Sequence, residues 1–178
     1  MRYFMGIDVG TNETKAVLID EKCEIVAFAS CGHDLLNPQP GFFEHDAEKT
    51  WWGDFCHLSR QLLAESGVDA KDVGCVGLSA LGCDCVPVDA EGTALCNAIL
   101  YGVDSRSHKE IEWLYAYYGK EEAERLYGHE LCSSDIAPKI LWVKNNLPDV
   151  YAKTAKFLTG SSYLCAKLIG SPAGYIDR

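Results

Sequence analysis

A short polar turn between two apolar runs, close to the start of the chain, most constrains what this sequence can fold into. Apolar residues dominate Tyr3 to Ile7 and Ala16 to Ile19. The segment between the runs carries an acid, a glycine, short polar side chains and a lysine: Asp8, Gly10, Thr11, Asn12 and Lys15. Two runs of strand length joined by so short a link predict an antiparallel hairpin.

The residues of this turn suit a phosphate group and a magnesium ion. Gly10 has no Cβ, so the backbone can turn sharply and bring its N–H groups close to an anion. Thr11 and Asn12 add hydrogen-bond donors, and Lys15 adds a positive charge. Asp8 is placed to face magnesium or its waters, because this ion takes few carboxylates beside substrate phosphates. Taken alone, the stretch is explained by an ordinary hairpin with a solvated aspartate. The choice between a phosphate site and an ordinary turn therefore depends on the rest of the chain.

The following segments alternate between strand and helix patterns. Three strand-like runs with short links predict an antiparallel meander: Tyr3–Val9, Thr14–Asp20 and Ile25–Cys31. Asp46 is a candidate N-cap for a helix whose buried face would hold Trp51, Phe55, Leu58 and Leu62. The apolar run Val73–Ser79 follows that helix, as in a parallel crossover. We therefore predict an α/β fold with a mixed sheet that starts with the meander, gains helix-connected strands and is flanked by helices.

Charge and cysteine content restrict the partners and the compartment. The formal net charge of −10 argues against nucleic acid and anionic membranes, since both favour a basic face. The nine cysteines form no Cys-x-x-Cys pair, which favours reduced thiols over a disulfide framework or a zinc site. No signal peptide and no run of about 20 apolar residues is apparent in the sequence. We expect a cytoplasmic protein that binds neither nucleic acid nor a membrane.

Four stretches, taken together and in this order, resemble the FGGY carbohydrate kinases of the actin, sugar kinase and Hsp70 superfamily, nearest the xylulose kinase branch. They are the hairpin at 6–15, the loop and helix start at 40–52, the segments between Val76 and Arg106, and Ala137–Trp142. The resemblance implies a ribonuclease H-like fold of the actin-like ATPase kind. It also implies ATP-dependent phosphorylation of a hydroxyl on a ketose or related polyol, a xylulose-like small molecule, with Mg²⁺; a homodimer is compatible with it.

The resemblance also assigns roles to residues. Asp8 would position magnesium, while Gly10, Thr11, Asn12 and Lys15 would contact the nucleotide phosphates. The sugar would be lined by Leu81, Gly82, Cys83 and Asp84, with Asp104 and Arg106 near the pocket mouth. Ser134 falls where some relatives place an aromatic sugar wall.

The sequence departs from the family pattern in two places. Xylulose kinases often show Gln-Met-His-Gly where this chain has Leu81 to Asp84, and the Arg-Glu pair of glycerol kinases is absent, so the sugar is left open. Family members are also much longer and place the catalytic aspartate in a second lobe. We expect residues 1–178 to be an incomplete N-terminal kinase domain without its C-terminal lobe, inactive by itself.

Several other interpretations are open at this stage. The main rival is a non-catalytic member of the superfamily that binds nucleotide to switch a partner interaction, and another is a free-standing small domain. Cys83 and Cys85 with Asp84 between them could ligate a metal, although packing in a strand is the commoner role. The stretch 31–34 could pair a thiol with a base, but it is more typical of a loop. His45 lies on a segment that reads as surface.

Overall fold

A four-stranded mixed sheet forms the centre of the molecule. The structure is a computed structural model that describes residues 2–171. The strand order is β3-β2-β1-β5, with the bounds Ile25–Gly32 for β3, Glu13–Asp20 for β2, Tyr3–Val9 for β1 and Val73–Ala80 for β5. β1, β2 and β3 are antiparallel neighbours, and β5 runs parallel to β1. The predicted meander and parallel strand are confirmed.

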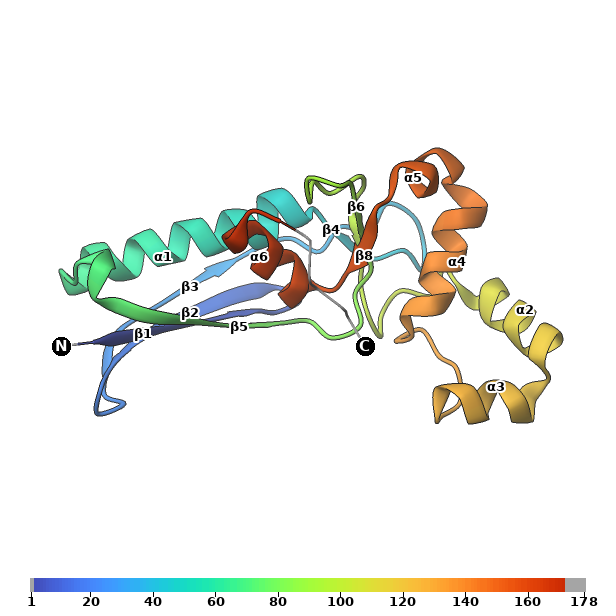
Figure 1. Cartoon of the computed structure of the whole chain (residues 1–178), viewed down its shortest axis with the longest axis horizontal. Coiled ribbons are helices and arrows are strands. Elements are labelled where there is room, and N and C mark those ends of the chain that lie inside the picture. The colour runs from blue at the N-terminus through green and yellow to red at the C-terminus, as the bar shows by residue number, and fades with distance from the viewer. Residues whose placement is uncertain (1, 172–178) are drawn as a thin grey trace.

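One face of this sheet carries the main core. Met5, Ile7 and Leu18 alternate with exposed or half-buried neighbours and are at most 5% exposed, as expected of strands with one buried face. Helices α1 (Gly53–Ser66) and α6 (Gly160–Ile169) lie on this side of the sheet (Figure 1).

The start of α1 follows the sequence pattern. A π-helical turn, η1 (Ala47–Trp52), precedes α1, and the carboxylate of Asp46 accepts a hydrogen bond from the backbone N–H of Lys49 at 2.9 Å. The cap and the apolar spacing were both predicted, and all four of the expected side chains are buried: Trp51, Phe55, Leu58 and Leu62.

The later strands do not extend the main sheet, contrary to the prediction. β4 (Glu44–His45) pairs with β7 (Ala98–Ile99), and β6 (Val86–Val88) pairs with β8 (Lys156–Leu158). The reason is that each of these short strands pairs with another short strand from a distant part of the sequence. A local apolar run predicts a strand but not its neighbour.

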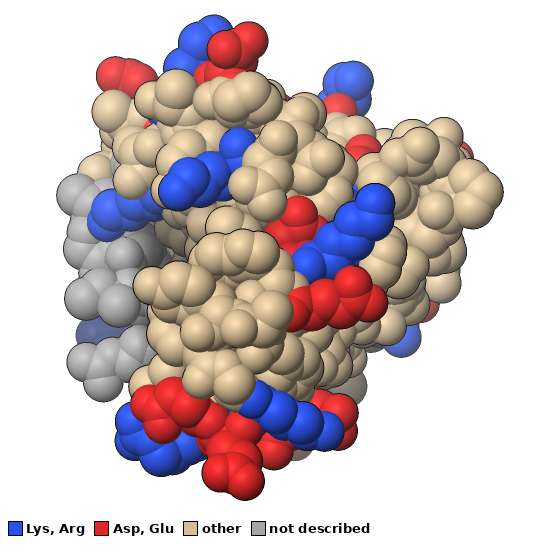
Figure 2. Space-filling model, turned by 90° about the vertical axis from the view of Figure 1, so that its right-hand side faces the viewer, with Lys and Arg blue, Asp and Glu red and all other residues tan. Residues whose placement is uncertain are grey.

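The remaining helices form the far end of the molecule (Figure 1). They are α2 (His108–Tyr118), α3 (Lys120–Tyr127), α4 (Ile136–Asn146) and α5 (Pro148–Lys153), and a short 3-10 turn, η2 (Ala70–Asp72), leads into β5. α4 ends just before Pro148, and Pro148 starts α5 because proline is well tolerated at the first helical position. Acidic and basic side chains lie side by side at the bottom of Figure 2, where this end of the molecule faces the viewer. Ion pairs of this kind occur on α3, for example between Glu122 and Arg125.

The opposite face of the main sheet is not covered by any element within residues 2–171. Phe28 is 56% exposed there, and Phe4 and Val26 are 37% and 40% exposed. A free-standing small domain would not be expected to leave such an apolar face open. Within the same residues, no helix has the length and apolarity needed to cross a membrane.

Candidate functional site

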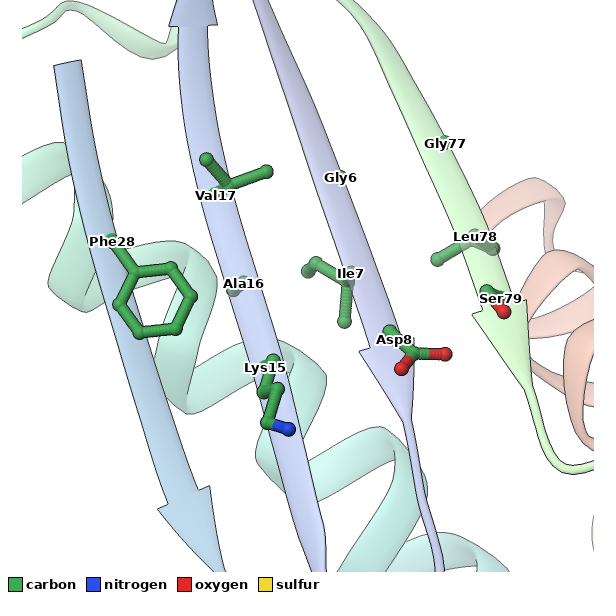
Figure 3. A pocket seen from close by; sticks show the side chains of 10 residues that line it. All are labelled: Gly6, Ile7, Asp8, Lys15, Ala16, Val17, Phe28, Gly77, Leu78 and Ser79. Carbon is green, nitrogen blue, oxygen red and sulfur yellow. The ribbon is translucent and has the colours of Figure 1, made fainter. Parts of the chain in front are cut away.

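A cavity of about 390 Å³ opens on the uncovered face of the sheet near the β1–β2 turn. Asp8 on β1 lies opposite Lys15 on β2 and Ser79 on β5, so three polar side chains from neighbouring strands line it (Figure 3). Its remaining lining is mostly apolar and includes Val17 and Phe28. The structure thus places the predicted magnesium ligand Asp8 beside the predicted phosphate residue Lys15.

The turn between β1 and β2 is tight. The N–H of Gly10 donates to the carbonyl of Glu13 at 3.0 Å, and a Cβ at position 10 would stand 2.9 Å from the same oxygen. Only glycine therefore fits this position without moving the turn.

The carbonyl groups of the turn are bound from the side of α1. Gly10 O faces His33 Nε2 at 3.1 Å, Thr11 O faces His45 Nε2 at 3.0 Å, and Asn12 O accepts from the backbone N–H of His33 at 3.0 Å. In a trans peptide the C=O and the following N–H point in opposite directions. Fixing the carbonyls of Gly10 and Thr11 therefore turns the N–H groups of Thr11 and Asn12 away from the histidines.

These two N–H groups are available to a ligand. Across the described part of the chain, neither the N–H of Thr11 nor that of Asn12 has a protein acceptor. Adjacent outward N–H groups of this kind make an anion-binding concavity. With Asp8 and Lys15 close by, the residues fit a phosphate group with its magnesium ion.

The sequence did not single out the histidines behind the turn. His45 is 0% exposed, so the expectation of a surface position is wrong, because β4 packs under the turn and Trp51 Nε1 donates to His45 Nδ1 at 2.9 Å. Burial lowers the pKa of His45 to about 4. Burial, with the nearby Asp54, raises the pKa of Cys31 to about 11. His33 bonds Asp54 at 2.8 Å.

The predicted sugar loop begins next to the hairpin. Leu81 N donates to the carbonyl of Val9 at 3.1 Å, and Gly82 and Cys83 are exposed. Asp84 is 0% exposed: Oδ1 accepts from the N–H of Tyr101 at 3.0 Å, and Oδ2 has no partner among residues 2–171. Burial raises the pKa of Asp84 to about 7, although that N–H and the charge of Lys139 oppose the change.

Lys139, another buried charge, lies under the same loop. Its Nζ donates to the carbonyl of Cys83 at 2.6 Å, and burial lowers its pKa. Cys83 is exposed whereas Cys85 is fully buried. No cluster of three or more His, Cys, Asp or Glu side chains in the described residues could hold a metal ion, so the suggested Cys-Asp-Cys metal site gains no support.

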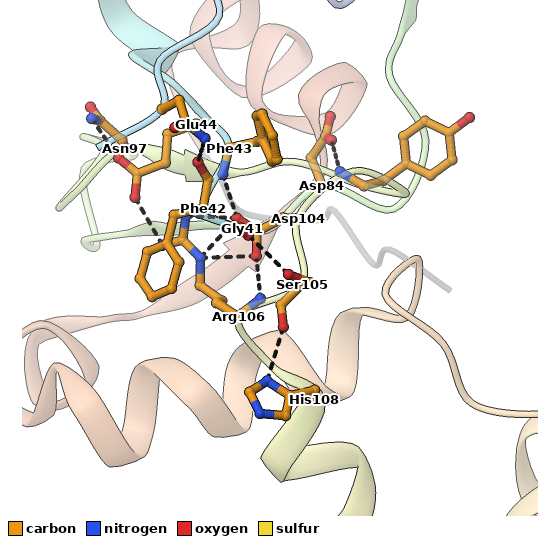
Figure 4. A network of polar contacts seen from close by, with 12 residues as sticks. Gly41, Phe42, Phe43, Glu44, Asp84, Asn97, Asp104, Ser105, Arg106 and His108 are labelled. Carbon is orange, nitrogen blue, oxygen red and sulfur yellow. Dashed lines mark hydrogen bonds and ion pairs between the residues drawn. The ribbon is translucent and has the colours of Figure 1, made fainter. Parts of the chain in front are cut away.

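Asp104 and Arg106 form a closed polar network (Figure 4). The Arg106 guanidinium donates to both Asp104 carboxylate oxygens at 2.8–3.0 Å and to Glu44 Oε1 at 2.8 Å. Its central carbon also lies over the rings of Phe42 and Trp142, 4.1 and 4.9 Å from their centres. Through these contacts Asp104 and Arg106 join the segment 42–44 to the segment 104–106, which together form the wall of the candidate site. A direct contact of either side chain with sugar stays a prediction.

An exposed aromatic ring connects the other predicted sugar residues. Tyr101 is 42% exposed, and a Cβ at Gly82 would lie 3.9 Å from its ring. The half-buried Ser134 lies beside Gly102, the residue that follows Tyr101. A Cβ built at Gly102 would stand 3.9 Å from the Oγ of Ser134. The fold thus brings the loop after β5, Tyr101 and Ser134 together. Tyr101 was not among the predicted site residues.

Comparison with known proteins assigns this arrangement to a family. The model of the FGGY family of carbohydrate kinases, N-terminal domain, matches residues 3–176. The chain belongs to this family.

Named relatives agree with the assignment. The chain is 28% identical over 170 residues to a xylulose kinase of Bacillus subtilis strain 168, covering 96% of this chain and 34% of the relative. It is 30% identical over 174 residues to a glycerol kinase of Methylorubrum extorquens strain PA1, covering 95% and 34%. The crystal structure of Plasmodium falciparum glycerol kinase with ADP superposes with a TM-score of 0.83 at 25% identity, covering 94% of this chain and 34% of that one.

These comparisons confirm the predicted actin-like ATPase fold class and the carbohydrate kinase family. The chain spans about a third of the length of the curated relatives it matches.

Proposed function

We propose that the protein containing this chain transfers a phosphoryl group from ATP to a hydroxyl of a ketose or related polyol. The observation that carries the proposal is the β1–β2 turn, whose N–H groups at Thr11 and Asn12 have no acceptor among residues 2–171 and which joins the strands that carry Asp8 and Lys15. Phosphoryl transfer needs positioning and charge stabilisation more than covalent chemistry from the protein. A turn with free N–H groups, a cation and a carboxylate supplies these requirements.

Each residue of the hairpin has a role in this proposal. The N–H groups of Thr11 and Asn12 bind phosphate oxygens, Gly10 permits the close approach, and Lys15 adds positive charge. Asp8 holds the magnesium ion or its waters. When bound, magnesium neutralises charge on the phosphates. This assignment accounts for the polar corner of an otherwise apolar cavity.

The acceptor sugar is proposed to lie over the loop at 81–84. Gly82 and Cys83 are exposed there, and Tyr101 offers a ring on which a sugar can pack. Ser134 leaves room where an aromatic wall would narrow the site. Asp104 and Arg106 keep the neighbouring loop in place. The relatives named as xylulose and glycerol kinases favour a ketose or polyol of that size.

The remaining parts of the reaction are proposed to come from outside this chain. The relatives are about three times as long, and a second lobe would bring the adenine pocket and the base that takes the proton from the sugar hydroxyl. We expect the 178-residue chain alone to show no turnover. All nine cysteines are free, which supports a reducing, cytoplasmic setting.

The test uses the protein at the full length of its reading frame. ADP formation is measured with D-xylulose and with glycerol, in parallel with thermal shifts produced by ATP and by each acceptor. A kinase releases ADP with one acceptor and is stabilised by sugar as well as by ATP. Stabilisation by ATP with no response to a panel of ketoses and polyols would favour the non-catalytic nucleotide switch instead.

A matched pair of variants locates the activity. Asp8→Asn is expected to lower the turnover rate by about a hundredfold or more, because it removes the magnesium ligand. Asp149→Asn, on the exposed surface of α5, makes the same chemical change away from the site and should leave the rate unchanged. Equal rates for the two variants would contradict the assignment of Asp8.

A further inference from the structure

We propose that His33, bound to Asp54, is a positioning residue that orients the phosphate-binding turn, and that it does so as an imidazolium ion. The proposal rests on the proposed function of the turn. It deepens that function, because it explains how a hairpin without a helix N-terminus presents outward N–H groups. The carbonyls of Gly10 and Asn12 both meet His33, through the ring and through the backbone N–H.

The protonation of His33 follows from its partners. Nδ1 faces Asp54 Oδ2 at 2.8 Å and Nε2 faces the carbonyl of Gly10 at 3.1 Å. Asp54 Oδ2 also accepts from the hydroxyl of Thr14 at 2.7 Å, so this oxygen acts as an acceptor. A carbonyl oxygen can only accept, and a neutral imidazole has a single N–H. Both ring contacts are hydrogen bonds only when both nitrogens of His33 carry protons.

His45 provides the contrast beside it. Its ring lies 4.9 Å from that of His33 in an edge-to-face arrangement. Trp51 Nε1 donates to His45 Nδ1, which leaves Nε2–H to donate to the carbonyl of Thr11. His45 is therefore a neutral donor, and burial and then the neighbouring charge of His33 lower its pKa. Two adjacent carbonyls of the turn are thus held by a charged histidine and by a neutral one.

The surroundings favour a single positive charge at His33. Its side chain is 7% exposed. The titratable groups near it are Asp54 from α1, neutral His45 from β4 and the Cys31 thiol of β3; the charge of Glu13 on β2 also acts on this thiol. Burial and Asp54 keep that thiol protonated. Asp54 is therefore the direct counter-charge of the imidazolium.

Loss of the Nε2 proton would weaken the phosphate site. The Nε2 lone pair would then face the lone pairs of Gly10 O, and nothing would hold that peptide with its N–H outward. Since the N–H of Thr11 belongs to the same peptide unit, its direction would relax. Phosphate affinity should therefore be lower in the form of the protein in which Nε2 of His33 carries no proton.

The first measurement needs no ligand. Long-range ¹H–¹⁵N spectra of the 178-residue chain report which ring nitrogens are protonated. Near pH 7 we expect both nitrogens of His33, and only Nε2 of His45, to carry protons. The amide shifts of Thr11 and Asn12 should differ between the forms of the protein with and without the Nε2 proton of His33. Asp54→Asn keeps the shape of the side chain that faces His33 but removes its negative charge, so the variant should contain His33 in the neutral form.

The second measurement titrates the same chain with inorganic triphosphate and follows the amides of Thr11 and Asn12. His33→Ala should weaken binding about tenfold, the value of one lost charge-assisted hydrogen bond. His33→Gln keeps an N–H donor without a charge, so it should recover most of the affinity. His57→Ala, exposed on α1, is the matched control and should bind like the parent.

The outcomes separate this proposal from the proposed function. An unprotonated nitrogen on His33 near pH 7, or a His33→Ala affinity within twofold of the parent, would overturn the role of His33. Melting curves of each variant show whether a loss reflects unfolding, and rescue by His33→Gln then distinguishes positioning from packing. Doubly protonated His33, together with turn amides that shift in His33→Ala, supports the positioning of the turn. If triphosphate then leaves those amides unchanged in the parent chain, the phosphate site of the proposed function fails instead.

Discussion

Replacing Arg106 by methionine should be among the most damaging single changes in this chain. The guanidinium is 3% exposed and makes four hydrogen bonds to carboxylate oxygens of Asp104 and Glu44. The Asp104 side chain is 1% exposed. In the variant this carboxylate would stay buried without its cation. Its Oδ2 would still be bound to the N–H of Phe43, which holds the carboxylate in the buried position.

The expected size follows from these contacts. Charge-assisted hydrogen bonds are worth about 1.5–3 kcal/mol each, and the stacking on two rings adds about 0.5–2 kcal/mol, but burying the charges offsets much of both. Removing one partner of a buried ion pair costs about 3–5 kcal/mol because the other charge stays behind. For a chain of this size, that loss lowers the melting temperature by roughly 6–20 °C.

Urea unfolding followed by circular dichroism measures the change in the free energy of unfolding. Arg106→Lys keeps the charge but loses the planar fork and part of the stacking, so an intermediate loss is expected. Arg125→Met removes an arginine of the exposed pair on α3 and should leave the midpoint unchanged. A loss below about 1 kcal/mol for Arg106→Met would refute the inference that this network holds the wall of the site.

Three further changes test other parts of the structure. Gly160→Ala places a Cβ 2.9 Å from that of Ala80 and should cost about 1–3 kcal/mol in urea unfolding, whereas Gly53→Ala, with its nearest neighbour atom at 3.7 Å, should not destabilise the chain. Burial raises the pKa of Asp84 from 3.8 to about 7. At pH values between these two, Asp84 retains its proton in the folded chain and has lost it in the unfolded chain. The free energy of unfolding should therefore fall as the pH rises from about 4 to 7, and Asp84→Asn should flatten that slope and stabilise the chain at pH 8 by on the order of 4 kcal/mol. An unchanged slope in the variant would show that another group titrates. Phe28→Gln, on the uncovered sheet face, should change the free energy of unfolding by no more than about 0.5 kcal/mol and reduce binding of the dye ANS. Undiminished dye binding would mean that another surface binds the dye.

Local patterns predicted most of the elements because their signals are local. The three strand-like runs at the start of the chain and the cap at Asp46 depend on residues that are close in the sequence, and the structure reproduces both. The pairing of the short strands was predicted wrongly. β4 pairs with β7 across more than fifty residues of sequence, and neither strand has more than two residues from which to read a pattern.

The site was predicted unevenly for a similar reason. Asp8, Lys15 and the turn glycine lie within one hairpin, so their proximity follows from the hairpin itself. The sequence does not show that Arg106 is closed in by Asp104 and Glu44, because Glu44 lies on a separate strand. The buried state of His45 was missed, since it depends on a tryptophan side chain in the following helical turn.

The third strand of the meander has a role that the hairpin alone does not suggest. A helix N-terminus offers free N–H groups because of its geometry, but a two-strand turn needs donors on its carbonyls to direct its N–H groups outward. β3 delivers that donor, because His33 follows directly after Gly32, which pairs with Glu13. The register on which this depends includes a bulge between Leu18 and Ile19. Side chains alternate faces along a strand, so a slip of one residue there would turn the His33 ring away from Asp54 and the turn. The orientation of the turn that we propose to bind phosphate therefore depends on the three strands of the meander, β4 and α1 together.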